Sequence, residues 1–207
     1  MIITPGLTKI EGFVKIHDPR TGEVLVDKKN AIHYENISIC MARTLSNRTL
    51  AQGGGFIYDM AFGNGGSAVD PTGVITYLPP NTVGTNASLY NETYAKVVDD
   101  NSASNLDPSN NYMTVVHTSG QPYTDIIVTC LLDYGEPAGQ QAFDNSTNFN
   151  GEYVFDELGL QCKVGADAGD LLLITHVIFH PVQKSLNRQI QIDYTLRIQT
   201  LTNLSVA

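Results

Sequence analysis

The sequence predicts a mainly β protein: an antiparallel β-sandwich with one flanking α-helix and long loop excursions. Residues 189–199 alternate without exception, apolar at even positions and polar at odd ones. A period of two places the apolar side chains on one face of an extended strand. Other short apolar segments are separated by clusters of Gly, Pro and Asn, and only one segment has a helical period. The 207 residues are expected to form a single domain, 1–207.

The first two strands are predicted at residues 13–17 and 23–27, joined as a hairpin. The connection Asp18-Pro19-Arg20-Thr21-Gly22 carries Pro at its second position and Gly at its end. Pro presets the backbone angle of a turn and Gly tolerates a positive φ, so this composition favours a tight reversal.

Residues 31–47 form the one predicted helix. Asn30 can cap its start, and Glu35 places a negative charge in its first turn. Apolar residues recur on one face at helical spacing, and we expect this stripe to pack on the sheet. The stripe consists of Tyr34, Ile37, Met41 and Leu45.

The remaining strands are short, and two long irregular segments interrupt them. The predicted strands are residues 56–62, 74–77, 94–98, 112–117, 126–132, 153–162, 171–179 and 189–200. The loop-rich excursion covers about 63–111, and the second long loop covers about 134–151. Tyr and Leu residues anchor the excursion, so we expect an ordered segment that carries partner contacts.

Composition narrows the range of partners. The net charge is −9, so the surface repels phosphate groups and direct nucleic-acid binding is not expected. Apolar runs are too short to cross a bilayer, and the first residues lack the basic start of a secretory signal. Only 16% of the residues are charged. A surface rich in neutral polar groups suits packing against other subunits, and equally suits plain loops.

No disulfide or metal site is predicted. Cys40, Cys130 and Cys162 are odd in number, lack a CxxC spacing and lie among apolar neighbours, so they are expected to be buried free thiols. His176 and His180 are four residues apart in a predicted strand. That spacing separates their side chains by about 13 Å, too far to share one metal ion.

Catalytic and cofactor-binding residues are also not predicted, and the protein is expected not to be an enzyme. The segment Gly63-Asn64-Gly65-Gly66-Ser67 could cradle a phosphate, but no Lys or helix follows it. A turn is therefore expected there. Nucleophile motifs such as Gly-x-Ser-x-Gly do not occur.

One pattern has the spacing of a calcium-binding loop. It comprises Ser146, Asn148, Asn150, Gly151 and Glu157. Ser replaces the usual Asp at the first position, and neither flank has a helical pattern. Hydrogen-bonded turns are the preferred interpretation of these Asn residues, and Ca²⁺ is the alternative.

Laid out in order, the elements resemble virion structural proteins of tailed bacteriophages. The likeness rests on three stretches: residues 13–36, residues 60–77 with Met60-Ala61-Phe62-Gly63-Asn64-Gly65-Gly66, and Phe155-Asp156-Glu157-Leu158-Gly159-Leu160 followed by the closing strands. Small tail, collar and fibre-attachment proteins share this order of hairpin, helix, glycine turn and acidic strand. The resemblance implies a multi-copy, non-enzymatic part of the particle and no catalytic residues.

The leading hypothesis is therefore a structural subunit of the virion, assembled in the bacterial cytoplasm. Its expected partners are other virion proteins and copies of itself, in a homo-oligomer within the particle. Tail, baseplate or collar is the first placement, and capsid decoration the second. The alternative is a carbohydrate-binding module for host-surface recognition, although the chain has no Trp for stacking. The candidate contact residues are Tyr77, Leu78, Tyr90, Tyr94, Tyr134 and Phe149.

Overall fold

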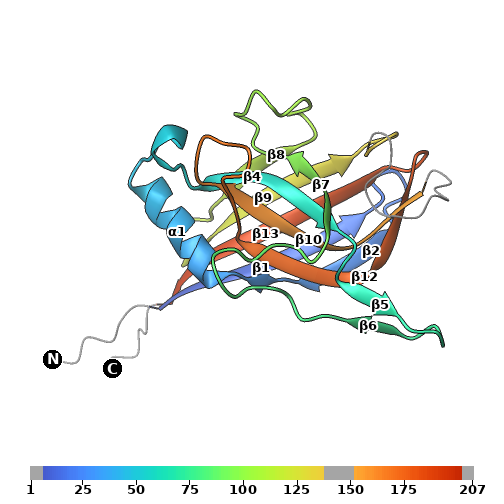
Figure 1. Ribbon diagram of the computed structural model, residues 1–207. Coiled ribbons are helices and arrows are strands. Elements are labelled where there is room, and N and C mark those ends of the chain that lie inside the picture. Colours follow the sequence, from blue (N-terminus) through green and yellow to red (C-terminus); the bar gives the residue numbers. More distant parts are fainter. Residues whose placement is uncertain (1–6, 138–151, 202–207) are drawn as a thin grey trace.

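Two antiparallel sheets packed face to face form the protein in a computed structural model that describes residues 7–137 and 152–201 (Figure 1). The first sheet has the order β2 (Val24–Lys29), β1 (Leu7–His17), β13 (Ile190–Leu201), β9 (Tyr123–Leu132) and β8 (Tyr112–Val116). The second has the order β3 (Ala31–Ile32), β12 (Thr175–Ser185), β10 (Glu152–Lys163), β4 (Phe56–Gly63) and β7 (Glu92–Val97), with β11 (Leu171–Leu173) also paired to β10.

Three smaller elements complete the fold. A separate hairpin, β5 (Ser67–Val69) and β6 (Ile75–Tyr77), projects from the body (Figure 1). The helix α1 (Tyr34–Leu45) lies at the opposite end, followed by a short 3₁₀ turn, η1 (Leu50–Gln52). The predicted mainly β architecture of antiparallel strands with one α-helix is thus confirmed for the described residues. None of their helices has the length and hydropathy needed to cross a membrane.

The core lies between the two sheets. One continuous buried cluster contains Val14 of β1, Phe62 of β4 and Phe155 of β10. Phe155 meets Phe62 edge to face with ring centroids 5.4 Å apart, an arrangement that aromatic pairs prefer. In β13, Ile190, Ile192 and Tyr194 are fully buried while the odd positions between them are half-buried, which confirms the predicted alternation.

The helix begins later than predicted. Residues 31 and 32 pair with β12 as strand β3, and the ring of His33, not Asn30, accepts the Asn36 N–H at 3.1 Å to cap α1. Asn30 is occupied elsewhere, because its amide donates to the Tyr194 hydroxyl. A short strand at the sheet edge therefore takes the place of the predicted first turn.

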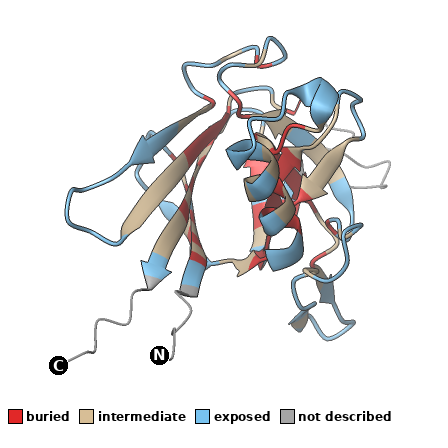
Figure 2. Ribbon diagram, turned by 90° about the vertical axis from the view of Figure 1, so that its left-hand side faces the viewer, coloured by how far each residue is buried: buried red, intermediate tan, exposed pale blue. Residues whose placement is uncertain are grey.

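The buried face of α1 also differs from the predicted stripe. Asn36, Ile37 and Cys40 are the buried residues of the helix. Tyr34 and Leu45 are 59% and 84% exposed. The helix covers an end of the sandwich rather than the broad face of a sheet (Figure 2), so only a narrow strip of it meets the core.

One predicted strand was wrong in its bounds, and one predicted strand divides the excursion. The segment 171–179 is two strands, β11 and β12, interrupted at Ile174, whose N–H donates to the Leu160 carbonyl at 2.9 Å. The strand predicted at 94–98 within the loop-rich excursion of 63–111 is found as β7, which pairs with β4 as an edge strand of the second sheet and divides the excursion. Residues 64–91, hereafter the excursion, and residues 98–111 are therefore separate loops.

Candidate functional site

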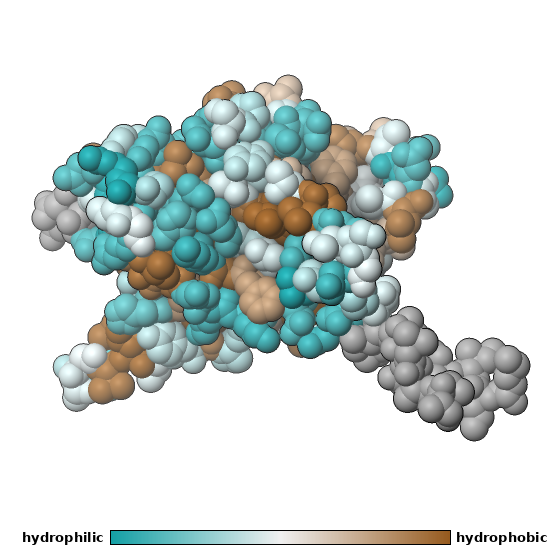
Figure 3. All heavy atoms as spheres, turned by 180° about the vertical axis from the view of Figure 1, so that it is seen from behind, coloured by the Kyte–Doolittle hydropathy of each residue, from teal (hydrophilic) through white to brown (hydrophobic). Residues whose placement is uncertain are grey.

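The β5–β6 hairpin exposes apolar side chains. We call residues 67–78 the hairpin arm. Val69 and Val74 flank its turn and are 62% and 56% exposed, and Tyr77 and Leu78 at its base are 49% and 45% exposed. Figure 3 shows hydrophobic side chains along this projection, at the lower left of the view. A two-stranded hairpin is marginally stable in water by itself, so the arm depends on how its base is held.

Glu157 of β10 holds the excursion to the sheet. Its Oε1 accepts the backbone N–H groups of Gly65 and Asn91 at 3.0 and 2.9 Å. Its Oε2 accepts the Tyr90 N–H at 3.0 Å and lies 3.0 Å from Nε2 of His176. Both ends of the excursion therefore converge on a single, fully buried carboxylate.

Asp156 fixes the start of the arm in the same manner. Its Oδ1 accepts the Gly66 N–H at 2.9 Å, and its Oδ2 accepts the Ser67 N–H at 2.7 Å and the Ser67 hydroxyl. Strand β5 begins at Ser67. The base of the arm is thus bonded to β10 at its first residue.

A β-bulge allows two consecutive carboxylates to serve the same loop. Adjacent side chains of a regular strand point to opposite faces. The pairing of β10 with β12 shifts between Phe155 and Glu157, while Phe155 and Leu158 both point into the core. Between the pairs Phe155–Val182 and Glu157–Ile178, β10 advances by two residues and β12 by four. This irregularity leaves Asp156 and Glu157 together outside the core cluster, beneath the excursion.

The glycine turn fits closely around these carboxylates. A Cβ added at Gly65 would lie 2.8 Å from the backbone nitrogen of Asn91, closer than real Cβ contacts come. The prediction of a turn at residues 63–67 is confirmed. Its N–H groups do converge on anions, as they would on a phosphate, but the anions are the side chains of Asp156 and Glu157.

The two carboxylates have opposite pKa shifts. Burial raises the pKa of Asp156, and the negative charge of Glu157 raises it further, against the lowering by Ser67 and Gly66. Burial also raises the pKa of Glu157, but the hydrogen bonds from His176 and three backbone N–H groups outweigh it, so the pKa is lowered overall. Glu157 is therefore the carboxylate that this arrangement keeps charged.

The hydrogen bonds of His176 define its tautomer. Its Nδ1 accepts the Asn81 N–H at 2.8 Å, so the proton of the neutral ring lies on Nε2 and is donated to Glu157. Both ring nitrogens are thus occupied, and the ring is fully buried. An imidazole held in this way fastens a loop and offers no nitrogen to a substrate.

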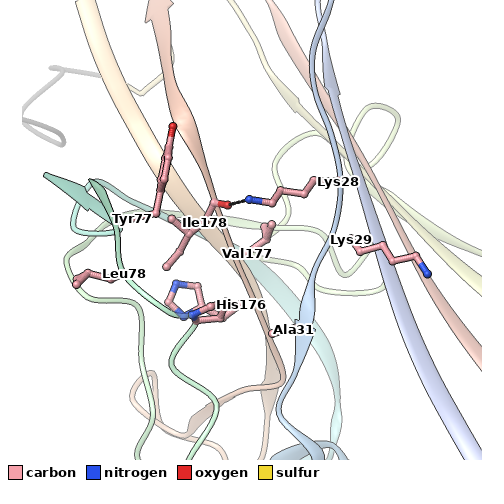
Figure 4. A pocket seen from close by; sticks show the side chains of 9 residues that line it. Lys28, Lys29, Ala31, Tyr77, Leu78, His176, Val177 and Ile178 are labelled. Atoms are coloured by element: carbon pink, nitrogen blue, oxygen red, sulfur yellow. Dashed lines mark hydrogen bonds between the residues drawn. The ribbon is translucent and has the colours of Figure 1, made fainter. Parts of the chain in front are cut away.

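A shallow pocket separates the arm from strand β2 (Figure 4). Its volume is about 210 Å³, and its walls include Lys28, Tyr77 and Leu78. Lys28 Nζ donates to the Ile178 carbonyl at 2.7 Å and lies 6.0 Å from the centroid of the Tyr77 ring. Lys29 also borders the pocket, but its side chain points away from Tyr77 (Figure 4).

A second, apolar groove opens at the end of the sandwich beside α1. Its volume is about 370 Å³. Figure 2 looks toward this end, where the two sheets diverge. The helix contributes Ile37, Met41 and Leu45, and the first sheet contributes Val115, Ile126 and Ile198. The groove thus lies at the other end of the molecule from the hairpin arm (Figure 1).

An acidic pair lies on the outer face of the second sheet. Asp59 is 4% exposed, and burial, reinforced by the charge of Glu92, raises its pKa to about 7. Gln161 Nε2 donates to Glu92 Oε2 at 2.8 Å. Asp59 Oδ1 and Gln161 Oε1 are both buried and have no hydrogen-bond partner among the described residues. A protonated Asp59 is the form that this environment favours.

Four of the predicted contact residues are exposed in the structure. Tyr77 and Leu78 are exposed on the arm, and Tyr90 and Tyr134 are 42% and 44% exposed. Tyr90 donates its hydroxyl to the Pro79 carbonyl, and Tyr134 accepts from Arg20.

Tyr94 lies in a strand, as predicted, but it is not an exposed contact residue. It belongs to β7 and packs on the core, with its ring centroid 6.0 Å from that of Phe62. Burial raises the pKa of its hydroxyl. The last candidate, Phe149, lies outside the described residues, as does most of the loop predicted at 134–151.

Other sequence expectations are borne out or fall outside the described chain. All three cysteines are free and buried, as predicted. His176 is buried against Glu157, whereas His180 is exposed with Nδ1 3.3 Å from the Tyr77 hydroxyl. Of the calcium-like pattern, Ser146, Asn148, Asn150 and Gly151 lie outside the described residues, and Glu157 is already bonded to His176.

Sequence reasoning missed the residues that fix the arm: Asp156, Glu157 and His176. The available signal was the pair of consecutive acids within an otherwise apolar strand, since a regular strand would bury one of them. No protein-family model matches this chain, and no significant match was found among curated proteins or solved structures.

Proposed function

We propose that the protein is a non-enzymatic structural subunit of a bacteriophage particle that assembles through its hairpin arm and loops. The tail, baseplate or collar is the first placement, and capsid decoration the second. Its partners would be other virion proteins and copies of itself, joined after synthesis in the bacterial cytoplasm. The observation that carries the proposal is the arm, which exposes Val69, Val74, Tyr77 and Leu78.

The anchoring of the arm supports this proposal. Burying and desolvating two carboxylates is costly unless each is hydrogen-bonded. Asp156 and Glu157 together accept bonds at both ends of the excursion. A rigid base reduces the entropy lost when a projecting segment is ordered by a partner. The buried carboxylates are therefore well suited to presenting an apolar surface to another protein.

The test is a particle-assembly experiment. The double substitution Val69→Glu and Val74→Glu would be introduced into the genome that encodes the chain, with Leu106→Glu as the matched control. Leu106 is 94% exposed and lies in the separate 98–111 loop. We expect the arm variant to reduce incorporation of the chain into purified particles, measured by mass spectrometry and electron microscopy. Normal particles containing the arm variant in full amount would contradict the proposal.

A carbohydrate-binding module is the second candidate. The observation that favours it is the half-exposed Tyr77 ring beside the pocket that Lys28 also lines. An exposed aromatic ring can stack on a sugar face. Glycan-array binding by the purified chain, lost in Tyr77→Ala, would support this alternative, and no binding to any glycan would remove it.

A further inference from the structure

We propose that the hairpin arm of one copy docks in the apolar groove beside α1 of the next copy, so that the chain associates head to tail. The proposal rests on the proposed function, because it names a second copy of the chain as the partner of the arm. It concerns two surfaces of the described residues that no contact within the chain brings together.

The groove offers the arm an apolar surface that the chain itself leaves accessible. Leu45 and Val115 line it and are 84% and 72% exposed. Met41, Ile126 and Ile198 lie deeper and are half-buried. Side chains of this kind gain free energy when a partner removes them from water.

The arm has the matching composition at its tip. Val69 and Val74 flank the turn and face solvent. The hairpin pairs only β5 with β6, without a third strand. A hairpin of two strands alone is only marginally stable in water. Burial of this tip would therefore stabilise both the hairpin and the assembly.

The charges at the two surfaces are complementary. The arm carries Asp70 at its turn, where hydrogen bonds from Thr72 and Val74 hold the pKa of the carboxyl below its ordinary value. Arg43 does not line the groove itself, but it lies next to Gly55 and acts electrostatically on Cys40, and both of these residues line the groove. Its guanidinium donates to the carbonyls of Gly53 and Val164. Within the described chain, no ion pair joins Arg43 or the nearby Arg48 to a carboxylate. In a protein of net charge −9, this end is suited to receive an acidic tip.

The positions of the two surfaces determine the symmetry. The arm and the groove lie at opposite ends of the molecule, and the base of the arm is fixed to β10, so an arm cannot enter its own groove (Figure 1). Contact between two different surfaces is heterologous. Such contacts generate rings when the rotation closes and filaments when it does not. This is the type of association expected of a multi-copy component.

The experiment uses the full chain and two complementary variants. The arm variant carries Val69→Glu and Val74→Glu, and the groove variant carries Leu45→Glu and Val115→Glu. All four side chains are more than half exposed, so the fold should tolerate the changes. Leu106→Glu is the control. Sedimentation velocity over a range of protein concentrations measures association of each variant and of a mixture of the two.

We expect the wild type and the Leu106→Glu control to associate, and each double variant to associate roughly tenfold or more weakly. The mixture should form a 1:1 complex, because the intact arm of the groove variant meets the intact groove of the arm variant. A wild type that stays monomeric, double variants that associate normally, or a mixture that stays monomeric would each overturn the inference. The proposed function has a separate readout: reduced particle incorporation of the arm variant would sustain it, with another virion protein as the partner.

Discussion

The carboxylate of Glu157 and the imidazole of His176 form a fully buried hydrogen bond, with 3.0 Å between Oε2 and Nε2. The two residues lie on neighbouring strands, β10 and β12, and both also bond to backbone N–H groups of the excursion. This pair connects the position of the hairpin arm to the packing of the second sheet.

Replacing Glu157 by Gln should loosen the excursion. Both Glu157 oxygens accept hydrogen bonds, whereas Gln has one accepting oxygen and an NH₂ group that would face N–H donors. We expect a loss of roughly 2–4 kcal/mol in the free energy of unfolding. Urea denaturation would measure this loss, with the exposed Glu23→Gln as the control.

Hydrogen exchange would locate the effect of Glu157→Gln. The amides of Gly65, Tyr90 and Asn91 should exchange faster, because they lose their acceptor. Amides in the β1–β13 ladder should be protected nearly as in the wild type under native conditions. Unchanged exchange at all three excursion amides would contradict the role assigned to Glu157.

Asp59 should make stability depend on pH. Its pKa in the folded protein is about 7, above its ordinary value of 3.8. Between these values the folded state binds more protons than the unfolded state, so stability falls as pH rises through this window. Asp59→Asn should remove that part of the slope and stabilise the protein at pH 8 by roughly 2–4 kcal/mol.

Thermal or urea unfolding at a series of pH values would test this prediction. The difference between the wild type and Asp59→Asn isolates the contribution of this residue from those of Glu92 and Asp156, whose pKa values burial also raises. The exposed Asp100→Asn serves as the control. Parallel pH profiles for the wild type and Asp59→Asn would show that Asp59 is ionised in the folded protein.

Gly159 should not tolerate a side chain. A Cβ at this position would lie within 3.0 Å of the Thr175 carbonyl oxygen and of a Leu173 methyl group, where the backbone of β12 passes close to β10. Since a backbone atom cannot move aside without breaking the sheet, Gly159→Ala should cost roughly 3 kcal/mol or more.

Gly169→Ala is the matched control, because nothing lies within 4 Å of the added Cβ there. Soluble expression and the thermal midpoint of both variants would measure the difference. If the two glycine variants have equal midpoints, the close approach of the two strands is not as described.

The sheets could be predicted because their sequence signal is local. The alternation of residues 189–199 specifies which face of β13 is buried, and the Pro and Gly of the first turn specify the β1–β2 hairpin. The division of 171–179 into two strands could not be predicted from the same signal. It depends on the shared partner β10, to which both β11 and β12 pair.

The site was harder to predict than the fold, because its bonds join residues far apart in the sequence. Glu157 reaches Gly65 and Asn91, 92 and 66 residues away. The bulge that directs Asp156 and Glu157 to the same side is a property of pairing with β12. Tyr77 and Leu78 could be predicted as exposed, since they lie among turn-forming residues. Tyr94 could not be distinguished from them by composition, and its burial follows from pairing with β4.

The free thiols of Cys40 and Cys130 should be alkylated at different rates. The hydrogen bond from Cys162 lowers the pKa of Cys40, with a further contribution from Arg43 against the effect of burial, whereas burial raises the pKa of Cys130 to about 12. Cys40 and Cys162 line the apolar groove, and Cys130 lies in the core between the sheets. Because the thiolate is the reactive form, Cys40 should be alkylated roughly tenfold or more faster than Cys130 in the folded protein.

Timed labelling with N-ethylmaleimide and peptide mass spectrometry would measure the rates, and Cys40→Ala should remove the fast phase. Equal rates for all three thiols would mean that they react only after global unfolding, and not through the groove.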